Sequence, residues 1–290
     1  MFRCTIAGVI KPRLVFMMKK SFNGKRGKDG GAVRNGKPQL PDPRYDFKSD
    51  RPPPMERSVP PEQAKLNRQL LDAVKNCDSR EMHRLVADRA DVNAWDDRGW
   101  TPLMHAVISD DVAIVCGLLA AGAHADASDK DGTTPLMLAA RDGRTKTVDW
   151  LIHFQAEVDA GDKNGRTALM LAARHNHTET ALLLINKKAN VNAADIFGCT
   201  PLMFALEDGR LESAEMLIDK GADLEARDNV NWTVLMRAAW QGYNNVVEML
   251  ISKGAGRDAK DNNGYTALSW ADMGGNSKTV KILERTGTDG

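Results

Sequence analysis

The sequence contains few cysteines, and no pattern brings them together. Its 290 residues include only four, Cys4, Cys77, Cys116 and Cys199, without a C-x-x-C pair or a spacing typical of metal ligands. Small secreted domains depend on dense disulfide frameworks, and this chain has none. The composition therefore favours a reduced, intracellular location, cytoplasmic or, in a eukaryote, also nuclear.

Long apolar runs are also missing. Residues 1–18 read MFRCTIAGVIKPRLVFMM, but Lys11, Pro12 and Arg13 interrupt the apolar stretch. The uninterrupted part is well below the length that the core of a signal peptide needs. We therefore expect neither secretion nor a membrane-spanning segment.

The patterns that usually carry catalysis are absent from the sequence. There is no Gly-rich phosphate loop, no nucleophile elbow and no pair of carboxylates outside predicted turns. His175 and His177 are close in sequence, yet neither a third nor a fourth metal ligand accompanies them. The sequence predicts no enzyme, no metal site and no cofactor.

Proline is scarce after residue 62, because nine of the 12 prolines lie in residues 1–62. This segment holds 14 Lys and Arg against 6 Asp and Glu, a charge of +8. The remaining 26 basic and 33 acidic residues leave the rest of the chain at −7. Without apolar periodicity the segment cannot offset its ordering entropy, so we expect a disordered, basic, Pro-rich tail.

Two short stretches of this tail allow more than one interpretation. The basic stretch KKSFNGKRGKDGG suits an anionic surface, a nuclear import receptor or nucleic acid, although a solvated tail is the plainer interpretation. Arg51 is followed by three prolines, which suit either a polyproline ligand or a stiff linker.

The rest of the chain repeats itself at a fixed spacing. The string T-P-L-M, or a close variant, begins at equal intervals along the chain, at Thr101, Thr134, Thr167, Thr200, Thr233 and Thr266. No insertion or deletion interrupts the series. A strict period of this length is the signature of a solenoid. Counting backwards, a degenerate first repeat begins near Gln63.

Local chemistry explains how each unit folds. Each unit opens with an aspartate at position 1 and has Gly or Asn at position 4, as a tight turn with positive φ requires. The Thr at position 6 is a good N-cap for a first helix, which position 15 ends with Asp, Gly or Asn. A second helix with apolar residues at i, i+3 and i+4 follows. The opening aspartates are Asp96, Asp129, Asp162, Asp195, Asp228 and Asp261.

The end of the second helix is less regular. Gly122, Gly221 and Gly254 stand there in three units, but Gln155 and Lys188 take their place in two others. A positive φ at either of these two residues stores about 1 kcal/mol of strain.

The repeated pattern closely resembles the ankyrin repeat, in which a turn precedes two antiparallel helices and T-P-L-H-x-A opens the first helix. The resemblance implies an all-α solenoid with short β-hairpin-like turns. Methionine replaces the family's His at Met104, Met137, Met170, Met203 and Met236. We expect these side chains to pack between repeats where the His would form hydrogen bonds.

The period divides the chain into a tail, 1–62, and a repeat domain, 63–287. The units are a degenerate cap at 63–95, repeats at 96–128, 129–161, 162–194, 195–227 and 228–260, and a C-terminal cap at 261–287. Glu284 stands in that cap where the preceding five units have Leu or Ile, as a face open to water requires.

The resemblance also implies which positions face the extended concave surface of stacked repeats. They are positions 2, 3 and 5 in the turn and positions 13 and 14 near the end of the first helix. Aromatic residues and arginines dominate there, and both are enriched in interface hot spots. The candidate partner-binding residues are Trp100, Arg141, Arg166, Arg174, Phe197, Trp232, Trp240 and Tyr265.

Some of these candidates have a second interpretation. Trp100 and Tyr265 either contact a partner or shield the turn. The three arginines form a basic strip, or they pair with Asp142 and Asp131. For Trp232 and Trp240 we predict one exposed aromatic patch, flanked by Phe197 and Tyr265.

The sequence thus predicts a monomeric, non-enzymatic scaffold, an adaptor or inhibitor, that binds a protein partner on its concave surface. The alternative is a binder of nucleic acid or an anionic membrane surface that acts through the basic tail. Asn93 and Asn192 also resemble asparagines that are hydroxylated in some ankyrin proteins, which leaves modification at these sites open.

Overall fold

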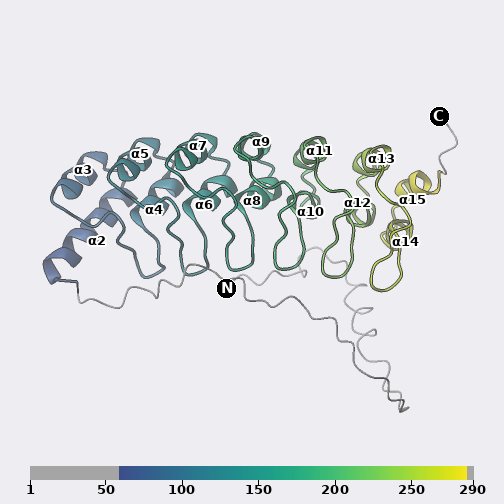
Figure 1. The fold of residues 1–290 in the computed structure, drawn as a ribbon, viewed down its shortest axis with the longest axis horizontal. Helices are drawn as coiled ribbons and strands as arrows, with labels where there is room; N and C mark the ends of the chain where they lie inside the picture. The colour runs from purple at the N-terminus through teal and green to yellow at the C-terminus, as the bar shows by residue number, and fades with distance from the viewer. Residues whose placement is uncertain (1–58, 286–290) are drawn as a thin grey trace, which may run out of the picture. The chain divides into compact units, whose positions relative to one another are not determined.

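The computed structural model describes residues 59–285, which form an all-α array of paired helices (Figure 1). The first helices are α2 (Pro61–Lys75), α4 (Pro102–Ser109), α6 (Pro135–Arg141), α8 (Ala168–Arg174), α10 (Pro201–Glu207), α12 (Val234–Gln241) and α14 (Ala267–Met273). The second helices are α3 (Ser79–Ala87), α5 (Val112–Ala120), α7 (Thr145–His153), α9 (Thr178–Asn186), α11 (Leu211–Asp219), α13 (Asn244–Ser252) and α15 (Ser277–Glu284). This confirms the predicted solenoid.

The helices lie in two rows, with the first helices in one row and the second helices in the other (Figure 1). Long loops between successive pairs extend from the side of the first helices. The predicted tail lies outside the described residues, except for residues 59–62, and Pro61 and Glu62 already belong to α2. The division of the chain into units by residue number remains a prediction.

The turns have the backbone geometry that the sequence predicts. Position 4 has a positive φ in all six units, including Asn231 at 62°. Position 15 does as well, including Asp110 at 57° and Asn176 at 61°. Two residues of the degenerate first unit follow the same rule, since Cys77 (55°) and Arg89 (67°) stand one period before Asp110 and Gly122. The first unit therefore keeps the backbone of its neighbours although its sequence has diverged.

Each first helix after α2 begins at a threonine N-cap. In all six units the hydroxyl accepts a hydrogen bond from the backbone N–H three residues later. In five of these units that residue is a buried methionine, which confirms its packing role, and in the last unit it is Ser269. In two units the methionine Sδ also accepts a hydrogen bond from the backbone N–H of the threonine itself: Met170 from Thr167 and Met236 from Thr233, both at 3.4 Å. The sequence pattern gave no indication of this second role.

Both rows of helices contribute to the core, and the first helices contribute it at two regular positions. Position 8 is a buried leucine from Leu103 to Leu235, and position 11 is a buried alanine in all six units. Leu268, at position 8 of the last unit, is 38% exposed. Glu284 is exposed as well. Both fit the expected C-terminal cap, because no later unit within the described residues covers them.

Candidate partner-binding surface

The aspartate that opens each unit holds the turn from which the candidate residues project. In all six units Oδ1 accepts two hydrogen bonds, from the backbone N–H groups two and four residues later. The second of these donors is the residue before the threonine, which is Trp100, Arg166, Trp232 or Tyr265 in four units. The carboxylate thus fixes the backbone of four candidate residues.

The second oxygen, Oδ2, accepts from a side chain in five units. The donors are His105 to Asp96 at 2.9 Å, Trp100 to Asp129 at 3.2 Å, Arg166 to Asp162 at 2.7 Å, Arg237 to Asp228 at 2.5 Å and Trp270 to Asp261 at 3.1 Å. Trp100 and Arg166 therefore have roles in the turns themselves. Burial lowers the pKa of His105 despite its hydrogen bond with Asp96, which favours a neutral imidazole.

The three candidate arginines all have carboxylate partners. Arg141 pairs with Asp142 at 2.8 Å, as one interpretation predicted. Arg166 pairs with Asp162 and Arg174 with Asp208, neither of them with Asp131. The Arg174 guanidinium also lies 5.9 Å from the centroid of the Phe204 ring. The positive charges of these three arginines are therefore balanced by carboxylates within the array.

The aromatic residues of the last two units gather around Trp270, which the sequence analysis did not single out. Its ring centroid lies 4.3 Å from that of Trp232 and 5.6 Å from those of Trp240 and Tyr265. Trp270 itself is buried, and Trp232 and Trp240 are half-buried. The expectation that Trp240 is an exposed side chain is therefore wrong, because it is half-buried and its indole forms a T-shaped contact with Trp270. The repeat offered a clue to Trp270, because it occupies the same position in its unit as Arg237. Each of the two side chains donates a hydrogen bond to the aspartate that opens its own unit.

Four exposed apolar side chains lie at the tips of neighbouring turns. Ile196 is 56% exposed, Phe197 43%, Val230 53% and Tyr265 42%. Backbone hydrogen bonds join these turns, because Asn229 N donates to the Phe197 carbonyl at 2.9 Å and Asn262 N to the Val230 carbonyl at 3.3 Å. The turns therefore present these side chains from a fixed backbone.

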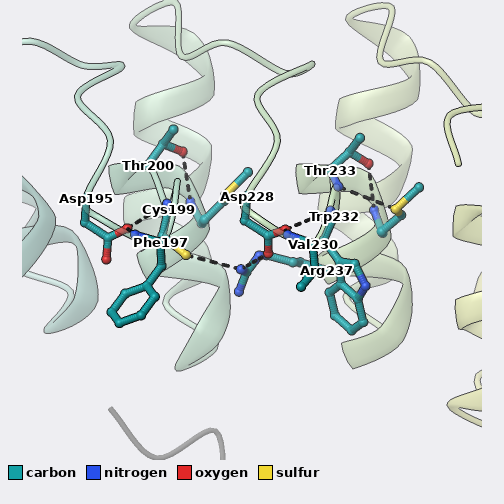
Figure 2. A network of polar contacts seen from close by, with 11 residues as sticks. Asp195, Phe197, Cys199, Thr200, Asp228, Val230, Trp232, Thr233 and Arg237 are labelled. Carbon is teal, nitrogen blue, oxygen red and sulfur yellow. Dashed lines mark hydrogen bonds and ion pairs between the residues drawn. The ribbon is translucent and has the colours of Figure 1, made fainter. Parts of the chain in front are cut away.

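Figure 2 shows the polar network beneath these tips. Arg237 Nη2 bridges Asp228 Oδ2 and Cys199 Sγ, the latter at 3.3 Å. Burial raises the pKa of the Cys199 thiol to about 12, against the opposing effect of Arg237. Burial likewise raises the pKa of Asp195, against its backbone hydrogen bonds from Cys199 and Phe197. Cys199 is therefore a protonated thiol at neutral pH and a poor nucleophile.

The two asparagines considered for modification join successive units instead of standing free. Asn93 Oδ1 accepts from His124 N, and Asn192 Oδ1 accepts from Asp223 N, both at 2.8 Å.

Among residues 59–285, no three His, Cys, Asp or Glu side chains gather as metal ligands would. No helix in this part of the chain has the length and apolar character needed to cross a membrane.

Comparison with known proteins agrees with this fold. A family model described as ankyrin repeats (3 copies) matches residues 70–162, 146–228 and 226–289. Among solved structures, the ankyrin repeat domain of Bcl-3, described as a unique member of the IkappaB protein family, is similar with a TM-score of 0.68. The two share 28% sequence identity, and the match covers 74% of this chain and 97% of that chain. The search of curated proteins finds no match.

Proposed function

Because this chain belongs to the ankyrin repeat family, we propose that it is a non-enzymatic scaffold, an adaptor or inhibitor, which binds a protein partner. The partner lies on the surface formed by the turns and the first helices. Four large apolar side chains exposed on neighbouring turns carry this proposal: Ile196, Phe197, Val230 and Tyr265. Apolar groups clustered in this way usually mark an interaction site.

The eight candidate residues contribute unequally to this surface. Trp100, Arg141, Arg166 and Arg174 form hydrogen bonds or ion pairs within the array, so part of their bonding capacity is used. Phe197 and Tyr265 are the most exposed of the eight, and Tyr265 joins Trp232 and Trp240 in the cluster around Trp270. We therefore place the strongest contacts in the units from 195 onward.

Replacement of Phe197 by alanine in the full chain tests the proposal. The side chain is exposed, so Phe197→Ala should leave the melting temperature unchanged within about 2 °C. Hot-spot aromatics typically contribute about 2 kcal/mol or more, so affinity for a partner isolated from the native cell should fall about thirtyfold. Titration calorimetry with that partner measures the change.

Asn263 offers a matched control, because it occupies the same turn position in the last unit and is also exposed. Asn263→Ala should change the affinity by less than about threefold. Equal binding by the wild type and Phe197→Ala would show that the partner uses another face. We expect the free chain to sediment as a monomer.

The uneven charge of the chain supports the second candidate, an anionic ligand for the basic segment. Residues 1–62 carry +8 and lie almost entirely outside the described residues. Binding to duplex DNA or to phosphatidylserine vesicles should then fall steeply with salt. Replacement of Lys19, Lys20, Lys25 and Arg26 by glutamine should abolish it. Binding that survives these changes would exclude this candidate.

A further inference from the structure

One turn departs from the pattern of the other five. Asp195 Oδ1 accepts from Phe197 N at 2.9 Å and Cys199 N at 2.8 Å, as in every unit. Its Oδ2, however, accepts from no side chain of residues 59–285, although the residue is only 8% exposed. In Figure 2 this oxygen carries no dashed line and points to the side on which the Phe197 ring lies.

The missing donor has a simple cause in the sequence. In the unit before, the donor to the aspartate is Arg166 at position 5, where this unit has Cys199. In the unit after, the donor is Arg237 at position 10, where this unit has Phe204. Cysteine and phenylalanine cannot replace a guanidinium. Arg237 does not supply the bond either, because its Nη2 is held by Asp228 and Cys199.

Desolvation of a carboxylate is costly where donors do not offset it. Asp195 Oδ2 is not fully buried, so a donor from outside the chain can reach it. Desolvation raises the pKa of Asp195, which reflects the same cost. The exposed side chains of Ile196 and Phe197 follow directly in sequence, and Val230 lies on the adjoining turn. The site thus combines one carboxylate oxygen that has no side-chain donor among residues 59–285 with three exposed apolar side chains.

We propose that Asp195, Ile196, Phe197 and Val230 form a subsite for an arginine side chain of the protein partner. The inference rests on the proposed partner-binding function and names the chemistry of one contact. A guanidinium suits it because the equivalent oxygens of Asp162 and Asp228 each accept from one. A guanidinium also packs its plane on an aromatic ring such as Phe197 while donating to a carboxylate, which a lysine ammonium does less well. The carboxylate repels phosphate, so neither nucleic acid nor an anionic lipid fits this subsite.

The test uses the full chain and a displayed library of short random peptides. Selected peptides should share an arginine flanked by apolar residues. The tightest of them is then made with citrulline, which keeps the shape of arginine without its charge. In fluorescence polarisation, the citrulline form should bind the wild type at least about tenfold more weakly than the arginine form. Asp195→Asn should weaken binding of the arginine peptide by a similar factor, and the two changes together should weaken it no further.

Asp129→Asn is the matched control, because Trp100 of the chain itself already occupies the equivalent oxygen. This variant should bind the arginine peptide within about twofold of the wild type. Circular dichroism confirms that both variants are folded.

The outcomes separate this inference from the proposed function. Peptides that lack arginine, tolerate Asp195→Asn and lose affinity with Phe197→Ala would overturn the arginine subsite and leave the partner-binding surface standing. Peptides insensitive to both variants would overturn the subsite and the placement of the surface together. Tight binding of a synthetic peptide of residues 9–28, lost in Asp195→Asn, would instead give the subsite to the chain's own N-terminal segment. Self-association lost in Asp195→Asn would give it to a second copy, and either result overturns an external partner.

Discussion

At the scale of single residues, Asp195 carries a cost that its five counterparts avoid. Asparagine keeps an oxygen for the two backbone donors and removes the buried charge. We expect Asp195→Asn to be as stable as the wild type at pH 7 or more stable by up to about 1 kcal/mol. Urea unfolding followed by circular dichroism measures the difference.

The same residue predicts how this difference depends on pH. The pKa of Asp195 is raised in the folded chain above its usual value of 3.8, mainly by desolvation and despite Arg237 and Arg166 nearby. As pH rises from 3.8 through the raised pKa, the unfolded chain releases its proton first, so the wild type loses stability from this group. The advantage of Asp195→Asn should therefore be largest at neutral pH and disappear near pH 3.8. An advantage that grows on acidification would contradict it.

Asp228→Asn provides the contrast, since it should destabilise the chain by about 1–3 kcal/mol. The substitution leaves Arg237 without its carboxylate acceptor, with only the weaker Cys199 thiol remaining, and the Nε of that arginine is already buried without a partner. Equal stability of the two variants would mean that the second oxygen matters little in any unit.

How far the sequence predicts these residues depends on the range of the interactions. The turn and N-cap geometry followed from Asp, Gly and Thr at fixed positions, because their hydrogen bonds span only two to four residues. The donor to each second oxygen comes from position 5, from position 10 or from the preceding unit. No single position of the repeat, compared across the units, therefore revealed that Asp195 lacks a side-chain donor to its second oxygen within the described part of the chain. The burial of Trp270 likewise depends on side chains of two units.

At the scale of the helices, the ends of α7 and α9 are strained. Gln155 has φ of 65° and Lys188 has φ of 76°, so the condition under which the sequence predicts strain at these two residues is met. Replacing either residue by glycine should stabilise the chain by roughly 0.5 to 1 kcal/mol, because glycine adopts this conformation without a Cβ clash. Urea unfolding of each variant gives the value.

Gly122→Ala is the matched control, because it makes the opposite change, from glycine to a residue with a Cβ, at the equivalent position of another unit. Gly122 has φ of 93°, and a Cβ added there would meet nothing within 4 Å. The expected loss of about 1 kcal/mol in Gly122→Ala is therefore a backbone effect alone. If Gln155→Gly lowered stability and Gly122→Ala raised it, the loss of chain entropy at glycine would outweigh the strain.

At the scale of the whole array, the strict period predicted the solenoid because each unit contacts mainly its neighbours. The period could not show how the last unit covers its free side. There Leu268 is exposed, while Trp270 is buried against Trp232 and Trp240 of the preceding unit. The aromatic cluster thus holds α14 to α12 at the end of the described array, next to the proposed partner-binding surface.

The last prediction follows from this attachment and concerns hydrogen exchange along the array. Units with neighbours on both sides should exchange most slowly, so amides of α6 to α12 should be the best protected. Trp270→Leu removes indole contacts and the hydrogen bond to Asp261, and it should speed exchange in α14 and α15 about tenfold or more. Amides of α6 should keep their rates, because several interfaces separate them from the change. If exchange rose equally in every helix, the array would open as one cooperative unit, and the cluster would stabilise the whole solenoid together with its end.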